Sequence, residues 1–264
     1  MRRIPVVALL AAGLVVSAAG AQEATWRFFE YAMELQWWWA SLDSETSMGG
    51  TTDGRNLRFE DKFGLQTEED IPHISLEVSP TAGHRIGFSY DTVEYAGGLV
   101  IPQQVLYDDT TFQAATQTQS QLDLRHAHLG YRYRFFDDIK WKSDVHLGVS
   151  LFSIDSEVRG TDALTGLPTM AGDRETTILP TFGLGALYQD EDWMENVTLH
   201  FVVWGMETRS QGSVLDGRAE AILELHRYVS VAAGYRISAL KARAGDDRTD
   251  LVIGGPFVSL LLSY

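Results

Sequence analysis

The feature that most constrains the fold is an alternation of apolar and polar residues with a period of two. Successive side chains of a β-strand point to opposite faces, so this alternation predicts strands with one apolar face. We expect about ten antiparallel strands, within a range of roughly eight to twelve. The ten segments are 30–42, 71–79, 83–95, 119–135, 139–156, 175–188, 194–207, 215–226, 229–240 and 250–264.

The first segment, EYAMELQWWWASL, shows the pattern clearly. Its odd positions from Tyr31 to Trp39 are all apolar, whereas Glu30 and Glu34 hold even positions. A helix would place these glutamates among apolar neighbours, because its period is about 3.6 residues. We therefore expect a strand in which Trp37 and Trp39 share the apolar face and Trp38 points the other way.

One segment changes phase along its length. Leu122 and Leu124 hold even positions, but further along the apolar residues, such as Tyr131 and Tyr133, hold odd ones. The change falls at Arg125–His126. An extra residue in one strand exchanges its two faces, so the sequence predicts a β-bulge at this point.

The predicted connections distinguish a membrane barrel from a soluble β-sandwich, which shows the same alternation. Short turns are expected at about 80–82, 136–138, 189–193 and 227–228. Long loops are expected at about 43–70, 96–118, 157–174, 208–214 and 241–249. Because short and long connections alternate from the first strand to the last, the sequence predicts an all-β, up-and-down transmembrane β-barrel.

The N-terminus predicts export. Arg2 and Arg3 precede an apolar run that ends in a small-residue cleavage site, the layout of a secretory signal peptide at 1–21. The barrel domain would then be 22–264. Its formal net charge would be −17 rather than −15, because two arginines are removed, and this argues against a nucleic-acid partner. The chain has no cysteine, which excludes disulfides, thiolate metal sites, a thiol nucleophile and a lipoprotein-type anchor.

Aromatic residues are expected at the two membrane interfaces, where a partly polar ring is favoured. On this argument the girdle residues are Tyr31, Trp37, Trp39, Tyr133, Trp141, Tyr188 and Tyr264.

The C-terminus, VSLLLSY, places Val258, Leu260, Leu262 and Tyr264 on one face. It resembles the C-terminal signal of bacterial outer-membrane β-barrel proteins, with Ser259 where that signal usually has glycine. The resemblance implies a location in the outer membrane of a Gram-negative bacterium, contact with its lipid and lipopolysaccharide, and recognition by the barrel assembly machinery. It gives neither a subfamily nor an oligomeric state.

The inward face is expected to carry charges of both signs. The candidate lumen-lining residues are Glu34, Arg85, Asp91, Arg125, His126, His128, Arg132, Arg134, Asp144, His146, Arg218, Glu220 and Arg236. Two interpretations remain open. The charges fill the interior as pairs, because an unpaired buried charge is costly, or they line a narrow passage for ions.

Catalytic patterns are weak. His126-Ala-His128 has a spacing that can chelate a metal, but no third ligand can be named. Asp144-Val-His146 resembles the Asp-x-His pair of the omptin proteases, but it falls in the half of its strand nearest a short turn. We therefore expect no enzyme, no cofactor and no metal.

The function expected is a porin-like narrow channel or a structural barrel of unknown substrate. The alternatives are an enzyme acting on lipid or peptide at the outer rim, and an adhesin or receptor displaying acidic loops such as 43–70. Three prolines, Pro72, Pro180 and Pro256, fall within predicted strands, where each lacks a backbone donor.

Overall fold

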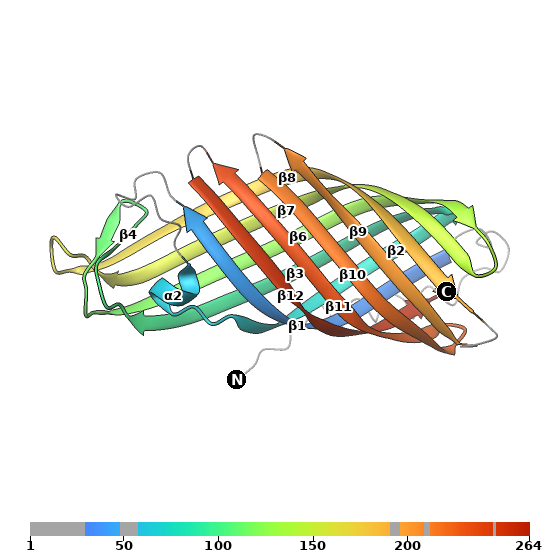
Figure 1. Cartoon of the computed structure of the whole chain (residues 1–264), viewed down its shortest axis with the longest axis horizontal. Coiled ribbons are helices and arrows are strands. Elements are labelled where there is room, and N and C mark those ends of the chain that lie inside the picture. The colour runs from blue at the N-terminus through green and yellow to red at the C-terminus, as the bar shows by residue number, and fades with distance from the viewer. Residues whose placement is uncertain (1–29, 48–57, 191–195, 209–211, 245–246) are drawn as a thin grey trace, which may run out of the picture.

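The computed structural model describes residues 30–47, 58–190, 196–208, 212–244 and 247–264, so the predicted signal peptide lies outside the described residues. Ten strands close into one antiparallel barrel (Figure 1). They are β1 (Glu30–Ser47), β2 (Glu68–Thr81), β3 (His84–Val100), β6 (Gln117–Asp137), β7 (Trp141–Thr161), β8 (Pro168–Gln189), β9 (Val197–Thr208), β10 (Gly212–His226), β11 (Val229–Ala244) and β12 (Asp247–Ser263). The predicted all-β barrel is confirmed.

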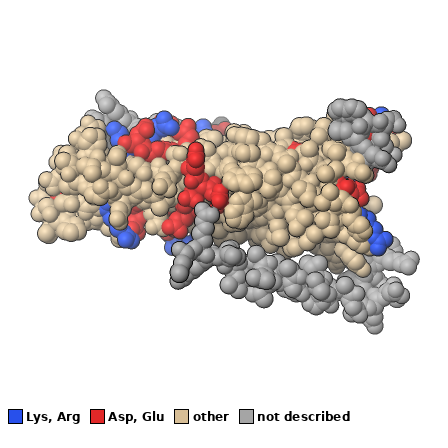
Figure 2. Space-filling model, turned by 90° about the horizontal axis from the view of Figure 1, so that it is seen from below, with Lys and Arg blue, Asp and Glu red and all other residues tan. Residues whose placement is uncertain are grey.

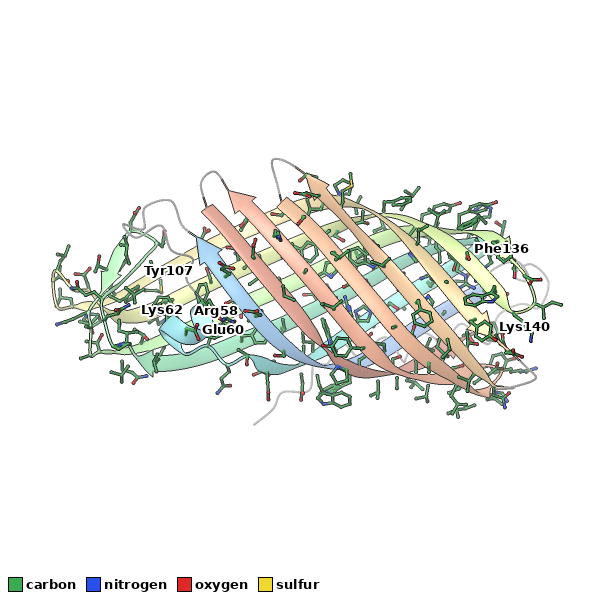
Figure 3. All side chains as sticks on the ribbon, in the orientation of Figure 1. Arg58, Glu60, Lys62, Tyr107, Phe136 and Lys140 are labelled. Atoms are coloured by element: carbon green, nitrogen blue, oxygen red, sulfur yellow. The ribbon has the colours of Figure 1, made fainter. Side chains whose placement is uncertain are left out.

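Three further elements were not predicted. They are the five-residue helix α2 (Phe59–Phe63) and the hairpin of β4 (Val105–Tyr107) and β5 (Thr110–Phe112). They lie together at one end of the barrel, which we name the loop end; the C-terminal end is the turn end. Figure 3 labels Tyr107 near the loop end and Lys140 at the turn end.

One side of the barrel is taller than the other. Strands β6, β7 and β8 have 21, 21 and 22 residues, whereas β9 has 12. The β8–β9 ladder covers only Phe182 to Gln189 of β8, so the rest of β8 continues toward the loop end without β9. We name the loop-end parts of β3, β6, β7 and β8 the tall wall; Figure 1 shows it in green to yellow.

Three predicted long loops are corrected. Most of 157–174 belongs to β7 and β8, which leaves only 162–167 as their connection. Only three residues separate Thr208 from Gly212, and two separate Ala244 from Asp247, so 208–214 and 241–249 are mostly strand. The turn-end connection between Gln189 and Val197 is longer than either. The polar and charged residues at these strand ends are typical of loops. In water, however, a strand can carry polar residues on its outward face, so the ladders continue.

The predicted bulge at Arg125–His126 is wrong. The pairing of β6 with β3 and β7 runs through this point without a shift, and the irregularity in this ladder lies at Arg134/Phe136. Leu122 and Leu124 are buried inside the barrel, whereas Arg125 is exposed on the outer face. The phase changes because the surroundings change: toward the turn end the apolar face points outward, and in the tall wall it points inward.

The outward face of the tall wall carries a row of carboxylates. Glu94 on β3 lies opposite Asp123 on β6, which lies opposite Asp155 on β7. The Gln121 amide donates to Glu94 at 3.1 Å and to Asp123 at 3.3 Å, and Arg174 lies 3.7 Å from Asp155. Adjacent carboxylates repel one another, so this row indicates that the face is in water.

Nearer the turn end the outward face is an apolar belt. Leu129, Leu147, Phe182 and Leu184 are about half exposed there, at 58%, 51%, 51% and 52%. Figure 2 shows a broad zone without charged side chains beside a band of charged ones. Such a belt is typical of strands that face lipid.

No helix among the described residues is long and apolar enough to cross a membrane.

Candidate functional site

The lumen at the loop end is filled by an apolar plug made of Phe59 and Phe63 of α2 and Tyr107 and Phe112 of the hairpin. The ring of Tyr107 meets those of Phe59 and Phe63 edge-on, with centroids 5.5 Å and 5.7 Å apart. Phe63 meets Phe112 in the same way at 6.1 Å. All four rings are at most 2% exposed and continue the core formed by the inward residues of the tall wall.

Polar contacts hold the plug to the barrel. Glu60 accepts hydrogen bonds from the backbone N–H of Ser44 at 2.6 Å and from its hydroxyl at 2.9 Å. Gly64 ends α2 with a positive φ of 65°, and a Cβ there would lie 2.9 Å from the Gly98 carbonyl oxygen. The Tyr107 hydroxyl lies 2.6 Å from that of Ser156, and burial raises the pKa of this phenol. The plug is therefore a fixed part of the fold.

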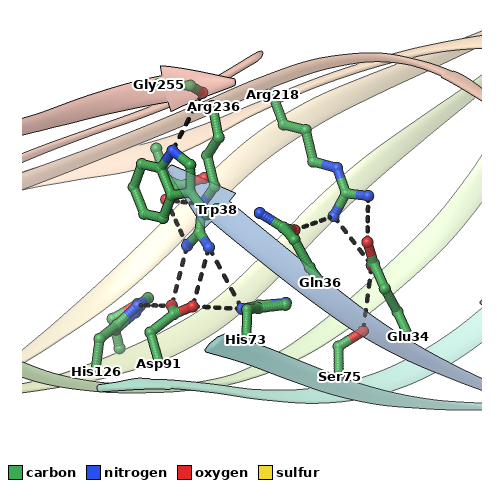
Figure 4. Close-up of polar contacts among 12 residues, drawn as sticks. Glu34, Gln36, Trp38, His73, Ser75, Asp91, His126, Arg218, Arg236 and Gly255 are labelled. Carbon is green, nitrogen blue, oxygen red and sulfur yellow. Dashed lines mark hydrogen bonds and ion pairs between the residues drawn. The ribbon is translucent and has the colours of Figure 1, made fainter. Parts of the chain in front are cut away.

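Below the plug, a network of charges centred on Arg236 crosses the lumen (Figure 4). Its guanidinium donates to both carboxylate oxygens of Asp91, at 3.0 Å and 3.1 Å, and to Asp216 at 2.9 Å and 3.1 Å. It also lies over the ring of Trp38, 4.8 Å from its centroid. Arg236 comes from β11, Asp91 from β3 and Asp216 from β10, so the network connects opposite walls of the barrel.

Two histidines complete the surroundings of Asp91. His73 Nδ1 lies 2.5 Å from one carboxylate oxygen, and His126 Nδ1 lies 3.1 Å from the other. The second ring nitrogen of His126 lies 3.4 Å from the Ser150 hydroxyl, which gives the order Ser–His–Asp. No local motif in the sequence indicates this order, because the three residues lie on three different strands.

The Ser–His–Asp geometry lacks access. Ser150 has no exposed surface. The His126 ring stacks on Phe152, with centroids 4.2 Å apart and planes 1° apart. Asp91 is already bound by Arg236. A nucleophile needs space for the reacting carbonyl next to its hydroxyl, and the packing around Ser150 does not leave it.

A second network lies further toward the turn end. Arg218 pairs with Glu34 and Glu220 and donates to the Gln36 side-chain oxygen at 3.2 Å. His200 Nδ1 lies 2.7 Å from Glu220. These groups come from β1, β9 and β10, and every charge in the set has a partner of opposite sign or a hydrogen bond.

Two smaller sets of ion pairs follow. Glu77 of β2 pairs with Arg85 at 3.1 Å and with Arg132 at 3.3 Å. Arg134 pairs with the buried Asp144 at 3.1 Å. The interior is thus occupied by ion pairs from the middle of the barrel to the turn end.

The histidine pair suggested as a chelate is engaged elsewhere. The His128 ring stacks on Trp204, with centroids 4.6 Å apart, and its Nε2 lies 3.2 Å from the Thr181 hydroxyl. His126 is held by Asp91 and Ser150. Among the residues that the structure describes, no three His, Asp or Glu side chains are placed to hold a metal ion.

Comparison with known proteins is informative for the fold. No family model matches the chain, and no curated protein matches it. The structure of the outer-membrane protease OmpT from Escherichia coli matches with a TM-score of 0.57 over 89% of this chain and 97% of that one, at 9% identity. The chain has the fold of a bacterial outer-membrane β-barrel.

Two further outer-membrane β-barrel structures match less closely. The toluene transporter TodX from Pseudomonas putida has a TM-score of 0.36 and 9% identity, covering 91% of each chain. Neisserial surface protein A has a TM-score of 0.32 and 13% identity, covering 87% of this chain and 96% of that one. With TM-scores below 0.5, these two structures carry no argument about this chain.

In this outer-membrane β-barrel, all but one of the predicted lumen residues lie on inward faces. The structure places the following on inward faces: Glu34, Arg85, Asp91, His126, His128, Arg132, Arg134, Asp144, His146, Arg218, Glu220 and Arg236. Arg125 is the exception. It was assigned to the lumen with the bulge, and without the bulge it lies on the outward, water-exposed face.

The predicted girdle residues of the β-barrel all lie outward. Trp141 and Tyr188 pair across β7 and β8 at the turn end, with ring centroids 4.7 Å apart. The backbone groups of Tyr31 and Tyr264 exchange hydrogen bonds of 2.9 Å and 2.8 Å at the same end. Tyr133, Trp37 and Trp39 are between 41% and 46% exposed. Their role at a membrane interface stays a prediction.

Proposed function

We propose that the protein is a closed structural β-barrel of the bacterial outer membrane, exported by a signal peptide at 1–21, and that its lumen is not a path for solutes. The observation that supports this proposal is that two independent layers fill the lumen in series. One is the apolar plug around Phe63 and Tyr107, and the other is the Arg236 network. Of the two interpretations of the lumen charges, paired filling is the one that this arrangement favours.

The energetics support closure. An ion crossing the lumen would separate Arg236 from Asp91 or Asp216, and these three residues are at most 7% exposed. Removing one partner of a buried ion pair costs about 3–5 kcal/mol. A solute would then have to displace the aromatic rings of the plug as well, so thermal fluctuations open both layers together only rarely.

The experiment is a conductance measurement on the mature chain. The protein is refolded in detergent, its barrel is verified by a heat-modifiable shift in gel mobility, and it is added to a planar bilayer. We expect a folded barrel without steady conductance. Steady conductance whose ion selectivity reverses in Arg132→Glu would overturn the proposal and establish the narrow channel. Mass spectrometry of protein isolated from membranes tests the export step, with Gln22 as the expected first residue.

The absence of catalysis belongs to the same proposal and rests on the inaccessibility of Ser150. A fluorophosphonate probe, which reacts with activated serines, is expected to leave the folded wild-type protein unlabelled. Labelling that disappears in Ser150→Ala but persists in Ser153→Ala, a matched serine on the same strand, would instead establish an enzyme.

A further inference from the structure

The ratio of arginines to carboxylates in the lumen reverses toward the turn end. In the middle of the barrel, Arg236 is paired with two carboxylates, and so is Arg218. Nearer the turn end, two arginines share one carboxylate: the oxygens of Glu77 lie 3.1 Å from Arg85 and 3.3 Å from Arg132. This second set therefore carries an excess positive charge.

The two arginines also face each other across neighbouring strands. Arg85 of β3 lies directly opposite Arg132 of β6, and Arg132 lies directly opposite His146 of β7. Like charges in directly opposed positions destabilise a sheet, and the single carboxylate of Glu77 offsets only half of the charge of this pair. The row formed by Arg85, Arg132 and His146 thus has many hydrogen-bond donors and few acceptors.

Two atoms of this row have no partner. The Nε of Arg132 and the Nε2 of His146 are buried, and neither has a hydrogen bond to the described residues. Buried polar groups are seldom left unpaired unless a water molecule or an ion satisfies them. An anion next to these side chains would accept hydrogen bonds and would offset the excess charge as well.

The neighbouring carboxylates do not supply this anion. Asp144 lies 3.1 Å from Arg134, which balances its charge. Asp137 lies 3.7 Å from the same arginine, and its side chain is 58% exposed to water. Glu30, at the first position of β1, is exposed. Among the described residues, Glu77 alone is paired with the two opposed arginines.

The lumen has room beside the two arginines. Although Arg85 and Arg132 point inward, their side chains are 29% and 24% exposed, against 5% for Arg236. Gly87 is the next inward residue of β3 after Arg85, and apart from its chain neighbours a Cβ there would meet no atom closer than 3.7 Å. Because the plug and the Arg236 network fill the lumen on the other side, a small solute reaches this space from the turn end, which faces the periplasm in outer-membrane barrels.

We propose that Arg85, Arg132 and His146 bind a small oxyanion such as phosphate, which enters the lumen from the turn end. A guanidinium group presents parallel N–H groups that match two oxygens of an oxyanion, whereas chloride offers no such pair of acceptors. The site does not depend on whether the lumen is closed beyond Arg236, since a barrel that conducts no ions would bind the anion at a blind end.

The experiment titrates inorganic phosphate with the refolded mature barrel in a phosphate-free detergent, and chloride keeps the ionic strength constant. The line width of the phosphorus-31 NMR signal measures binding, and we expect a saturable broadening with the wild type. Arg85→Gln and Arg132→Gln should each weaken binding by at least about tenfold, because a charge and its hydrogen bonds are lost. Arg227→Gln is the control, since Arg227 is an exposed arginine in the β10–β11 turn at the same end, and it should bind phosphate as the wild type does.

Glu77→Gln should have the opposite effect. It removes the carboxylate that competes for both arginines, so the affinity for phosphate is expected to rise. Asp138→Asn, which removes an exposed carboxylate near the β6–β7 turn, should leave the affinity unchanged. The absence of broadening with the wild type, or equal weakening in Arg132→Gln and Arg227→Gln, overturns the proposal. Gel mobility verifies that each variant is folded, and if Glu77→Gln does not fold, the two arginine variants and their control decide the result.

Discussion

The indole Nε1 of Trp38 donates a hydrogen bond of 3.1 Å to the carbonyl oxygen of Gly255, across the seam where β1 and β12 close the barrel. The ladder between these strands is interrupted at this point: Trp38 pairs with Phe257, and the next pair is Ser41 with Gly254. Pro256 lies in the gap and has no backbone N–H to donate to β1. The indole therefore adds a hydrogen bond between β1 and β12 at the point where their ladder is interrupted.

Replacing Trp38 by Phe keeps an aromatic ring but removes this donor. The Gly255 carbonyl would be left unpaired in a buried seam, and leaving such a group unsatisfied costs about 1–3 kcal/mol. We expect the midpoint of urea unfolding in lipid vesicles to fall accordingly. Trp37→Phe, at an outward position next to it, is the control and should change the midpoint much less. Equal shifts in both variants would contradict this role for Trp38.

Arg236→Met is expected to be among the most destabilising single substitutions in the barrel. It leaves the carboxylates of Asp91 and Asp216 buried without their cation, at a cost of about 3–5 kcal/mol. Adding Asp91→Asn and Asp216→Asn to Arg236→Met should restore much of the lost stability, since no uncompensated charge remains. Urea unfolding measures both variants.

The control for Arg236 is Arg159→Met. Arg159 pairs with Glu157 on the outside of the tall wall and is 61% exposed in its side chain. Exposed pairs contribute about 0–1 kcal/mol, so this variant should unfold close to the wild type. If the two arginine variants lost similar stability, the Arg236 network would not be the structural centre of the lumen.

In the tall wall the apolar side chains point inward and the polar ones point outward, and this orientation predicts a labelling pattern. The chain has no cysteine, so single cysteines can be introduced without background. In the vesicle-inserted barrel, Arg125→Cys should react with a charged maleimide, whereas Leu124→Cys should not react until the protein is unfolded. Leu129→Cys also points outward but lies in the apolar belt and should be protected by lipid. A bulge at Arg125–His126 would give the opposite result for the first two.

The tip of the β7–β8 connection predicts a pH dependence. One carboxylate oxygen of Asp162 accepts hydrogen bonds from the backbone N–H groups of Leu164 and Thr165, at 2.8 Å and 2.7 Å, and from the Thr165 hydroxyl at 2.9 Å. These bonds lower the pKa of Asp162. A lowered pKa means that the carboxylate stabilises the turn above about pH 3.9, the usual carboxyl value, and that this contribution is lost as the pH falls through the lower folded value.

Carboxyl NMR in detergent micelles measures this titration. We expect Asp162 to titrate below the usual range, and Thr165→Ala to move its pKa upward, because one donor is lost. Titration of wild-type Asp162 at or above the usual value would show that the turn does not form in solution.

The alternation in the sequence predicts the strands correctly where their outward side chains face lipid. Against lipid, outward side chains must be apolar, so β1, β3 and β7 show their period of two over the belt, and the opposite faces of Trp37 and Trp38 follow from it. The same rule failed above the belt. There Leu124 is inward and Arg125 is outward because water replaces lipid, and a local pattern does not reveal on which side of that boundary it lies.

The site was predictable as a set of residues but not as an arrangement. Alternation assigns Asp91 and Arg236 to the inward face, but they are 145 positions apart, and nothing in either segment indicates that they pair. The plug was missed because α2 has five residues and β4 and β5 have three each, too few to show a period. Phe59 and Phe63, spaced by four, were the available signal of a helical turn.

The change along β6 from an apolar to a polar outward face also fixes the depth at which the protein sits in its membrane. If the barrel moved in the direction of its turn end by one two-residue repeat of its strands, Arg125 and Asp123 would approach the hydrocarbon. For a cationic residue the cost rises from about 0–1 kcal/mol near the interface to about 2–4 kcal/mol at the midplane. Movement in the direction of the loop end would expose Leu129 and its neighbours to water. Both displacements are opposed, so the tall wall is held at a constant height above the bilayer, and whatever it presents is presented at a set distance from the lipid.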